Sequence, residues 1–380
     1  MGKIRVVEGQ LFRFPFTLKK AFRIALGATN HVEEIILRLR TEDGHEGWGE
    51  ASPSPMILGS TPGTTLAALD ALLPVVLGED PRRIGYLVEQ MDQEMVGQSA
   101  AKAAVDIALH DLVGNITGEP VWRMLGGHRT ERVETDFTVG MDDPRTMAAV
   151  AKELVDQGFS TIKVKVGGDP EMDVARVWVI REAVGDDVAI RIDANQGWTV
   201  PQAIWALAAM SECDVQLAEQ PVAAEDIEGL ARVRVHSPIP VMADEAAHSP
   251  EDALRVIRAG AADYVNIKLM KAGGLWRARE IAVICRAANI PNMIGGMVES
   301  NISATAAIHF AIAEGNVVYR DLDLAERPEA KLVKEGPTEI EDGEQVLLQP
   351  DAPGFGFGPL HEDWLVEEKT YRLGEEVGDA

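Results

Sequence analysis

Five charged residues recur along the middle of this chain at nearly equal intervals, each at the end of a short, mostly apolar segment. They are Lys165, Asp193, Glu219, Asp244 and Lys268, and the intervals between them are 28, 26, 25 and 24 residues. One strand, one helix and two loops together need about 30 residues. The spacing therefore predicts that these residues end successive strands of a repeating β/α unit. In a (β/α)8 barrel such strand ends meet at one mouth, where active sites lie.

The apolar segments predict an α/β fold, a (β/α)8-type TIM barrel, within a chain of 380 residues. Because a bare barrel needs only about 250 residues, room remains for a second domain. An open doubly wound sheet for a dinucleotide would require Gly-x-Gly-x-x-Gly after its first strand, and the chain has no such motif there. The expected strands cover residues 133–139, 161–166, 189–192, 215–218, 241–243, 264–267, 292–295 and 317–321.

The first third of the chain has a different pattern. Alternating segments at 32–40 and 44–50 predict antiparallel strands, and small or turn-forming residues predict loops at 25–30 and 52–63. Apolar spacing predicts two helices, of which the first ends at Pro74. These helices cover residues 65–73 and 99–116.

We therefore predict three regions. Residues 1–125 form an α+β capping domain, with specificity loops near 20–30 and 52–63. Residues 126–350 form the barrel, which carries the catalytic and metal-binding residues. Residues 351–380 return to pack on the cap.

The net charge of the chain limits the classes of partner that we expect it to bind. A net charge of −25 would repel nucleic acid and anionic membranes, so neither is expected as a partner. The chain has no run of 18 apolar residues and no apolar segment at its N-terminus. We expect a cytoplasmic protein that acts on a small molecule.

Three carboxylates, Asp193, Glu219 and Asp244, end neighbouring strands and predict a metal site. A lone Asp at a strand end is usually a helix cap, but three acidic residues in phase on adjacent strands favour joint coordination of one metal ion. Ligands that are all oxygen atoms favour a hard cation, and Mg²⁺ suits carboxylates that leave room for substrate. We expect one Mg²⁺ per subunit, with Asn195 and Glu245 just behind its ligands.

Lys165 and Lys268 lie half a ring apart, so they are expected to face each other across the mouth. Lys163 shares their inward face because side chains alternate along a strand. An ion pair with a neighbour would explain any one buried lysine. Three beside a carboxylate cluster instead predict proton transfer. A substrate carboxylate on the metal would place its α-carbon between two lysines, so that one removes the proton and the other returns it on the opposite face.

These motifs resemble the muconate-lactonizing-enzyme subgroup of the enolase superfamily. The resemblance covers nearly the whole chain, including Lys163-x-Lys165, the three carboxylates, Lys268 and the segment 294–300. It implies 1,1-proton transfer by Lys165 and Lys268 through a metal-stabilised enediolate, with Lys163 as an electrostatic helper. It also implies that Thr135, Gly296 and Val298 line the substrate site. A homo-oligomer is expected as well.

Asp321 and Asp323 share one face of the last expected strand, opposite the metal ligands. Two carboxylates at that place are expected to bind an ammonium group. A substrate with a carboxylate on Mg²⁺ and an ammonium across the mouth fits a dipeptide, and this Asp-x-Asp resembles that of dipeptide epimerases. Capping of a helix or a local pair with an arginine is the alternative role.

The cap loops suggest which dipeptides are accepted. Relatives that take acidic dipeptides carry an arginine in the first loop, where Gly27 stands here, and Arg23 lies four residues earlier. The second loop offers Met56, Ile57 and Leu58. We expect a hydrophobic second residue in the substrate, with a cationic one next.

Other functions stay open at this stage. On the same scaffold the chain could be an N-acylamino-acid racemase, an o-succinylbenzoate synthase or a muconate cycloisomerase, although none of their substrates offers a free ammonium to Asp321 and Asp323. A Schiff-base lyase using Lys268, or a metal-dependent binding protein without catalysis, are further alternatives.

Overall fold

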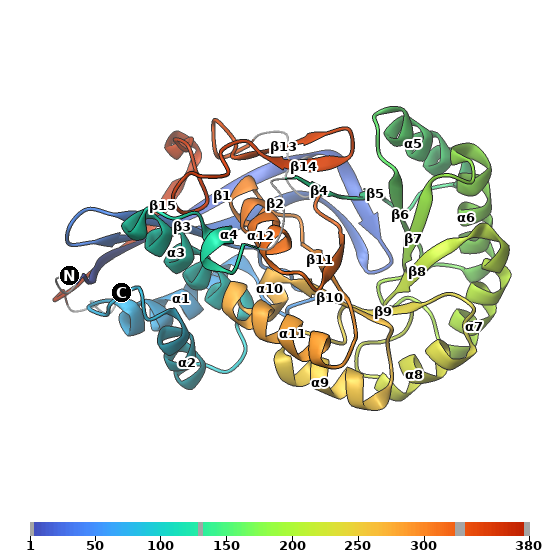
Figure 1. The fold of residues 1–380 in the computed structure, drawn as a ribbon, viewed down its shortest axis with the longest axis horizontal. Coiled ribbons are helices and arrows are strands. Elements are labelled where there is room, and N and C mark those ends of the chain that lie inside the picture. The colour runs from blue at the N-terminus through green and yellow to red at the C-terminus, as the bar shows by residue number, and fades with distance from the viewer. Residues whose placement is uncertain (1–3, 128–131, 324–330, 376–380) are drawn as a thin grey trace.

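The computed structural model describes residues 4–127, 132–323 and 331–375, and it centres on one curled, parallel, eight-stranded sheet (Figure 1). The strands follow the order β12-β11-β10-β9-β8-β7-β6-β5, so neighbours in the chain are neighbours in the sheet. This topology confirms the predicted barrel architecture. The strands are β5 (Phe137–Val139), β6 (Thr161–Lys165), β7 (Ala189–Asp193), β8 (Val215–Glu219), β9 (Val241–Ala243), β10 (Tyr264–Lys268), β11 (Asn292–Gly295) and β12 (Val317–Arg320).

The first and last strands of the sheet approach each other through two hydrogen bonds. The N–H of Asp136 donates to the carbonyl of Arg320 at 3.2 Å. The N–H of Leu322 donates to Thr135 Oγ1 at 2.9 Å. These contacts bring β5 and β12 together, so the curled sheet surrounds one interior.

The expected first strand, 133–139, is wrong as a single element. Residues Arg132–Glu134 form β4, which joins β13 (Thr338–Glu341) and β14 (Glu344–Leu347) in a separate three-stranded sheet. The reason is visible in the backbone: Thr135 donates its N–H to Gly343, while only residues 137–139 pair with β6. The chain changes sheets within a segment whose sequence looks continuous.

Helices follow the strands and form an outer arc around the sheet, from α5 to α9 in Figure 1. Local sequence signals set where several of them begin: Asp143, Asp169 and Ser249 each accept backbone N–H groups, and a proline follows each at the first helical position. No helix among the described residues is long and apolar enough to cross a membrane. The helices are α5 (Pro144–Asp156), α6 (Pro170–Val184), α7 (Val200–Ala209), α8 (Ile227–His236), α9 (Pro250–Ala259), α10 (Leu269–Ala272), α11 (Leu275–Ala287) and α12 (Asn301–Ala313).

The cap is a four-stranded antiparallel sheet in the order β15-β1-β2-β3, against which helices pack. A Cβ atom at Gly49 would lie 2.0 Å from the carbonyl of Ala104, so only glycine lets helix α3 come this close to the sheet. The C-terminal strand β15 pairs with β1. The elements are β1 (Val6–Ile24), β2 (Gly27–Thr41), β3 (Glu46–Ala51), β15 (Val366–Arg372), α1 (Pro62–Val76), α2 (Ile84–Glu94), α3 (Ser99–Thr117) and α4 (Val121–Met124).

Two expectations for the cap were wrong. Only residues 25–26 of the expected loop 25–30 form a turn: β1 and β2 are a long hairpin in which Ile24 pairs with Gly27, because pairing between strands overrides weak local propensity. Pro74 does not end the first helix, which continues to Val76. A proline this close to the C-terminus interrupts little of the helix, and the helix stops two residues later.

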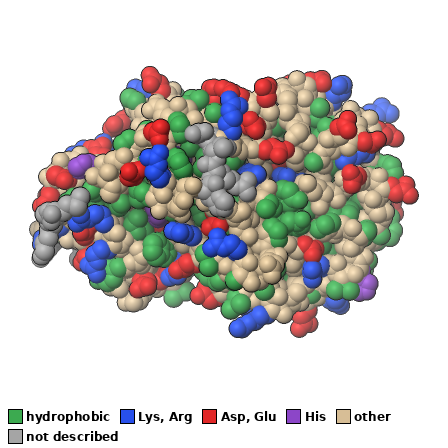
Figure 2. Space-filling view, viewed as in Figure 1, with side chains coloured by type: hydrophobic (Ala, Val, Ile, Leu, Met, Phe, Trp, Pro, Cys, Tyr) green, Lys and Arg blue, Asp and Glu red, His purple; other side chains and the backbone are tan. Residues whose placement is uncertain are grey.

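The face shown in Figure 2 carries acidic side chains with lysine and arginine side chains interspersed among them. On this face the acidic side chains are not gathered at one place.

Three buried carboxyl groups meet where the cap rests on the barrel: Glu34 on β2, Glu50 on β3 and Glu299 after β11. Glu50 accepts hydrogen bonds from the N–H groups of Ser300 and Ser303 and so caps α12. Glu34 Oε2 and Glu299 Oε1 accept none from any described residue. Burial, and then the charge of Glu50, raise the pKa of Glu299 to about 8.

Replacing Glu299 with glutamine is expected to stabilise the protein at alkaline pH. A carboxyl whose pKa is raised by folding holds its proton in the native state, so the stability of the wild type falls as pH rises from the unfolded value of 4.5 towards about 8. Glu299→Gln removes this loss. Urea unfolding of metal-free protein at about pH 9 should show a gain on the order of 5 kcal/mol, which shrinks at about pH 5.

The matched control is Glu153→Gln, whose carboxyl is exposed on α5. A wild type and a Glu299→Gln variant whose stabilities change in parallel with pH would contradict the expectation.

Candidate active site

Three carboxylates from adjacent strands come together at the mouth of the barrel. Asp193 ends β7 and pairs in register with Glu219, which ends β8, and Asp244 follows β9 directly. Carboxylate oxygens of all three lie within 4.8 Å of one another, and all three side chains are buried. A donor set made only of carboxylate oxygens can hold a hard divalent cation.

Lysine ammonium groups surround these carboxylates. Lys165 Nζ lies 2.5 Å from Asp193 Oδ2, and Lys268 Nζ lies 2.7 Å from Asp244 Oδ2. Lys163 Nζ lies 2.7 Å from Glu219 Oε2. Lys165 and Lys268 come from β6 and β10 and border the same pocket, so the structure brings the two lysines to one cavity.

The charges in this cluster depend on one another. Burial lowers the pKa of Lys268, but the carboxylates of Asp244 and Glu219 outweigh it, so this pKa lies above its ordinary value. Burial raises the pKa of Asp193, and the ammonium groups of Lys165 and Lys163 bring it below its ordinary value. These groups therefore form a network of ammonium and carboxylate charges.

Two amide side chains stand behind the carboxylates. Asn195 donates from its backbone N–H to Asp193 Oδ1 at 2.9 Å and from Nδ2 to Glu245 Oε1 at 3.1 Å. Asn266, which the sequence analysis missed, donates from Nδ2 to Glu219 Oε1 at 2.7 Å. A signal existed, because Asn266 lies two residues before Lys268 and so shares its inward face.

Gln220 is a second residue that the sequence analysis missed. Its Oε1 accepts the N–H groups of Asp244 at 2.9 Å and Ala246 at 3.0 Å, which fixes the loop after β9. The φ angles of Gln220 and Asn195 are 35° and 40°, in the left-handed region that non-glycine residues rarely adopt. Such strain at two neighbouring strand ends is typical of functional sites.

Asp321 and Asp323 lie just beyond β12 and also border the pocket. Asp321 Oδ2 lies 2.7 Å from Lys163 Nζ, and its Oδ1 accepts a hydrogen bond from Thr138 Oγ1 at 3.2 Å. The N–H of Thr138 donates to Asp323 Oδ2 at 2.9 Å. Asp321 therefore contacts Lys163 of β6 and Thr138 of β5.

Thr135, expected among the substrate-lining residues, does not line this pocket. It is buried, and its hydroxyl accepts from the N–H of Leu322 and donates to the carbonyl of Asp136. Thr138 takes the place in the lining, because the chain leaves the β4 sheet between these two threonines. Gly296 and Val298 do border the pocket.

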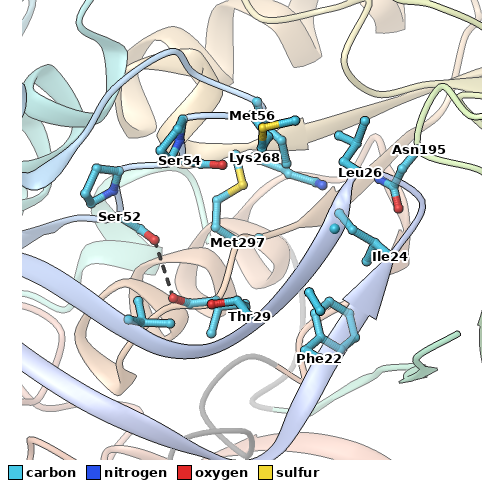
Figure 3. A pocket seen from close by; sticks show the side chains of 18 of the residues that line it. Phe22, Ile24, Leu26, Thr29, Ser52, Ser54, Met56, Asn195, Lys268 and Met297 are labelled. Atoms are coloured by element: carbon cyan, nitrogen blue, oxygen red, sulfur yellow. Dashed lines mark hydrogen bonds between the residues drawn. The ribbon is translucent and has the colours of Figure 1, made fainter.

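The pocket has a volume of about 520 Å³ and lies between the barrel mouth and the cap (Figure 3). This size falls within the range of small-molecule sites. Its barrel side carries the charged groups described above. Apart from His31, Lys165 and Lys268 are the only basic residues among the described residues that line it.

The cap side of the pocket is largely apolar, and its polar residues are Thr29, His31, Glu33, Ser52 and Ser54. In Figure 3, Phe22, Ile24 and Leu26 reach it from the β1–β2 hairpin, and Met56 reaches it from the loop after β3. The ring of Phe22 lies 5.9 Å from Lys165 Nζ. Gly27 is in the lining, whereas Arg23 is not.

Comparison with known proteins gives two family matches. Residues 8–126 match the N-terminal domain of mandelate racemase and muconate lactonizing enzyme. Residues 146–364 match the enolase C-terminal domain-like family. The matched segments cover the cap and most of the barrel.

Individual relatives are similar over most of their length. A hydrophobic dipeptide epimerase of Enterococcus faecalis is 43% identical over 307 residues, which cover 80% of this chain and 86% of the relative. An L-Ala-D/L-Glu epimerase of Bacillus subtilis is 35% identical over 358 residues, which cover 93% and 97%. The crystal structure of a dipeptide epimerase from Enterococcus faecalis V583 with Mg and L-Leu-L-Tyr has a TM-score of 0.90 at 39% identity and covers 94% of this chain and 100% of that one.

Proposed function

Since the chain belongs to the enolase superfamily, with the N-terminal domain of mandelate racemases and muconate lactonizing enzymes, we propose that it is a Mg²⁺-dependent dipeptide epimerase. One observation carries the proposal: Lys165 and Lys268 border a single pocket beside three clustered carboxylates, with Asp321 and Asp323 in the same lining. We also propose that residues 1–125 form the cap, residues 126–350 the barrel, and residues 351–380 a segment that returns to the cap.

Asp193, Glu219 and Asp244 are the residues that would hold Mg²⁺. They fit the ion because carboxylate oxygens of all three, from three neighbouring strand ends, lie within 4.8 Å of one another, and a hard divalent cation prefers oxygen ligands. When bound, the ion would act as a Lewis acid on the substrate carboxylate and make the neighbouring α-proton more acidic. The structural relative from Enterococcus faecalis contains Mg together with a dipeptide.

Lys165 and Lys268 are the proposed acid and base. One takes the α-proton of the C-terminal residue, and the other gives a proton to the opposite face, so one C–H bond breaks and one forms at the same carbon. The substrate is neither oxidised nor reduced, and its configuration inverts. Which lysine acts as the base depends on the epimer that binds. Lys163 has an electrostatic role, because its buried ammonium lies between Glu219 and Asp321.

Asp321 and Asp323 are the proposed site for the ammonium group of the dipeptide. Both carboxylates border the pocket, and strand β12 lies four strands from β8 in the sheet order. A charge-assisted hydrogen bond to an ammonium group is among the stronger polar contacts in proteins. A free ammonium distinguishes a dipeptide from the substrates of the alternative enzymes, none of which offers one.

The apolar cap side favours a hydrophobic side chain in the substrate. Burial of a leucine-sized side chain contributes about 1.5–3 kcal/mol, or about a 10- to 100-fold gain in affinity. An acidic side chain in contact with Ile24, Leu26 and Met56 would lose hydration without gaining a cation there. Glu33 is a carboxylate in the cap lining that also pairs with Arg13, so a cationic side chain is the second choice.

The experiment that tests this proposal is α-proton exchange with a panel of substrates in D₂O, followed by NMR or mass spectrometry. With Mg²⁺ present, L-Ala-L-Leu should exchange and epimerise. We expect kcat/KM for L-Ala-L-Glu to be about 10- to 100-fold lower, and N-acetyl-L-Leu to exchange poorly. No exchange with any L,L-dipeptide would reject the proposal, and exchange of N-acylated amino acids alone would favour a racemase.

The variant that sharpens this experiment is Asp323→Asn, compared with Asp156→Asn at an exposed position on α5. Asp323→Asn should raise KM for the dipeptide about tenfold or more, since a charged partner of the ammonium is lost, yet leave residual N-acetyl-L-Leu exchange nearly unchanged. An equal effect on both substrates would contradict the ammonium site.

A further inference from the structure

Lys271 is a buried lysine that the proposed reaction does not use. It lies on the short helix α10, three residues after Lys268, and is 2% exposed. Its Nζ donates to three backbone carbonyls, those of Asp244 at 2.5 Å, Asn266 at 2.9 Å and Ala247 at 3.1 Å. The same Nζ lies 2.5 Å from Asp244 Oδ1. A buried ammonium so fully surrounded by oxygen atoms is held in one position.

The two carboxylate oxygens of Asp244 therefore face different partners. Oδ1 faces Lys271, while Oδ2 faces Lys268 at the pocket. Lys271 also binds the carbonyls at both ends of the 244–247 turn, and Gln220 binds N–H groups in the same turn. Both the backbone and the side chain of Asp244 are thus fixed from behind.

The same division recurs in the other two carboxylates. Asp193 Oδ1 accepts the N–H of Asn195, and Glu219 Oε1 accepts from Asn266 Nδ2. Their second oxygens, Asp193 Oδ2 and Glu219 Oε2, face the lysines of β6. Each member of the trio has one oxygen held by a fixed donor and the other directed to the lysines. Only for Asp244 is the fixed donor a charged group.

We propose that Lys271 is a positioning residue that orients Asp244, so that Oδ2 alone is offered to the metal and to Lys268. The inference rests on the proposed function, because it assumes that the trio binds Mg²⁺. Lys271 has two opposing effects on that ion. Its orientation of Asp244 favours binding, whereas its positive charge repels a cation. The proposal requires that orientation be the larger effect.

Calorimetric titration of the full-length chain with Mg²⁺ tests this balance. Lys271→Met should raise the Kd for Mg²⁺ about 10- to 100-fold, the usual effect of removing a partner that orients a metal ligand. Exchange of L-Ala-L-Leu by the same variant should fall at low Mg²⁺ and recover in part at saturating Mg²⁺. Damage of a merely structural kind would not respond to added Mg²⁺ in this way.

The matched control is Lys102→Met. Lys102 is also buried, lies on α3 against α10, and donates to the Met95 carbonyl and to Asp92, away from the trio. This variant should bind Mg²⁺ with wild-type affinity. Lys271→Gln, which keeps an amide donor without the charge, is the second variant, and urea unfolding shows whether each variant is folded.

The possible outcomes distinguish a positioning role of Lys271 from a role in folding and from failure of the proposed function. Unchanged or tighter Mg²⁺ binding by folded Lys271→Met overturns the positioning role, since charge repulsion would then be the larger effect. Failure of both Lys271 variants to fold, while Lys102→Met folds, also overturns it and leaves a role in folding alone. A wild type that binds no Mg²⁺ would instead refute the proposed function.

Discussion

Replacing Lys268 with alanine is expected to lower the rate of epimerisation about 10²- to 10⁴-fold, the usual contribution of a general acid or base. The same holds for Lys165→Ala. Because each lysine is proposed to serve one face of the α-carbon, the two losses should not be identical. Each variant should still exchange the α-proton of the epimer that faces its remaining lysine, with retention of configuration. Proton NMR in D₂O with chiral analysis of the product measures both effects.

The control for both is Lys152→Ala, which removes an exposed lysine of α5 and should leave exchange unchanged. Far-ultraviolet circular dichroism confirms that each variant is folded. If Lys165→Ala and Lys268→Ala lose exchange of both epimers to the same extent, the assignment of one lysine to each face is wrong.

Replacing Asp193 with alanine is expected to abolish activity towards both epimers at once. Asp193 Oδ2 lies 2.5 Å from Lys165 Nζ and 3.2 Å from Lys163 Nζ, so its removal deletes one of the three proposed ligands and leaves two ammonium groups beside the proposed metal position. Affinity for Mg²⁺ should fall by more than about 100-fold, beyond the effect of losing an outer partner. Calorimetric titration with Mg²⁺ and exchange from each epimer measure the two losses.

This pattern differs from that of the lysine variants, which should bind Mg²⁺ but fail on one face. Asp156→Ala, at an exposed position of α5, is the control and should bind Mg²⁺ as the wild type does. Wild-type Mg²⁺ affinity in Asp193→Ala would exclude this residue as a ligand, and the proposed three-carboxylate metal site would then be wrong.

Sequence reasoning located the central residues because a parallel barrel has strict geometry. Strands in register carry their last residues to the same height, so Lys165, Asp193 and Glu219 had to become neighbours once they ended adjacent strands. The alternation of side chains placed Lys163 on the same face as Lys165. Its Nζ reaches Glu219 and Asp321 accordingly.

The residues that sequence reasoning missed depend on contacts that have no local signature. Gln220 binds a turn that follows a different strand. Thr138 replaced Thr135 because residues 132–134 join a sheet formed with the segment 338–347, far away in the chain. No pattern within residues 133–139 reports where that partner lies.

The periodicity of the chain by itself determined the barrel, the order of its strands and the charged residues at its mouth, since these follow from repeat length, register and the two-residue alternation of strands. Only the tertiary structure decided which oxygen of Asp244 faces the pocket, how the hairpin at 24–27 covers it, and that Lys271 is held beneath Asp244. The physical reason is range: repeats and alternation act over a few residues, whereas ion pairs and packing join atoms that are close in space whatever their separation in the chain.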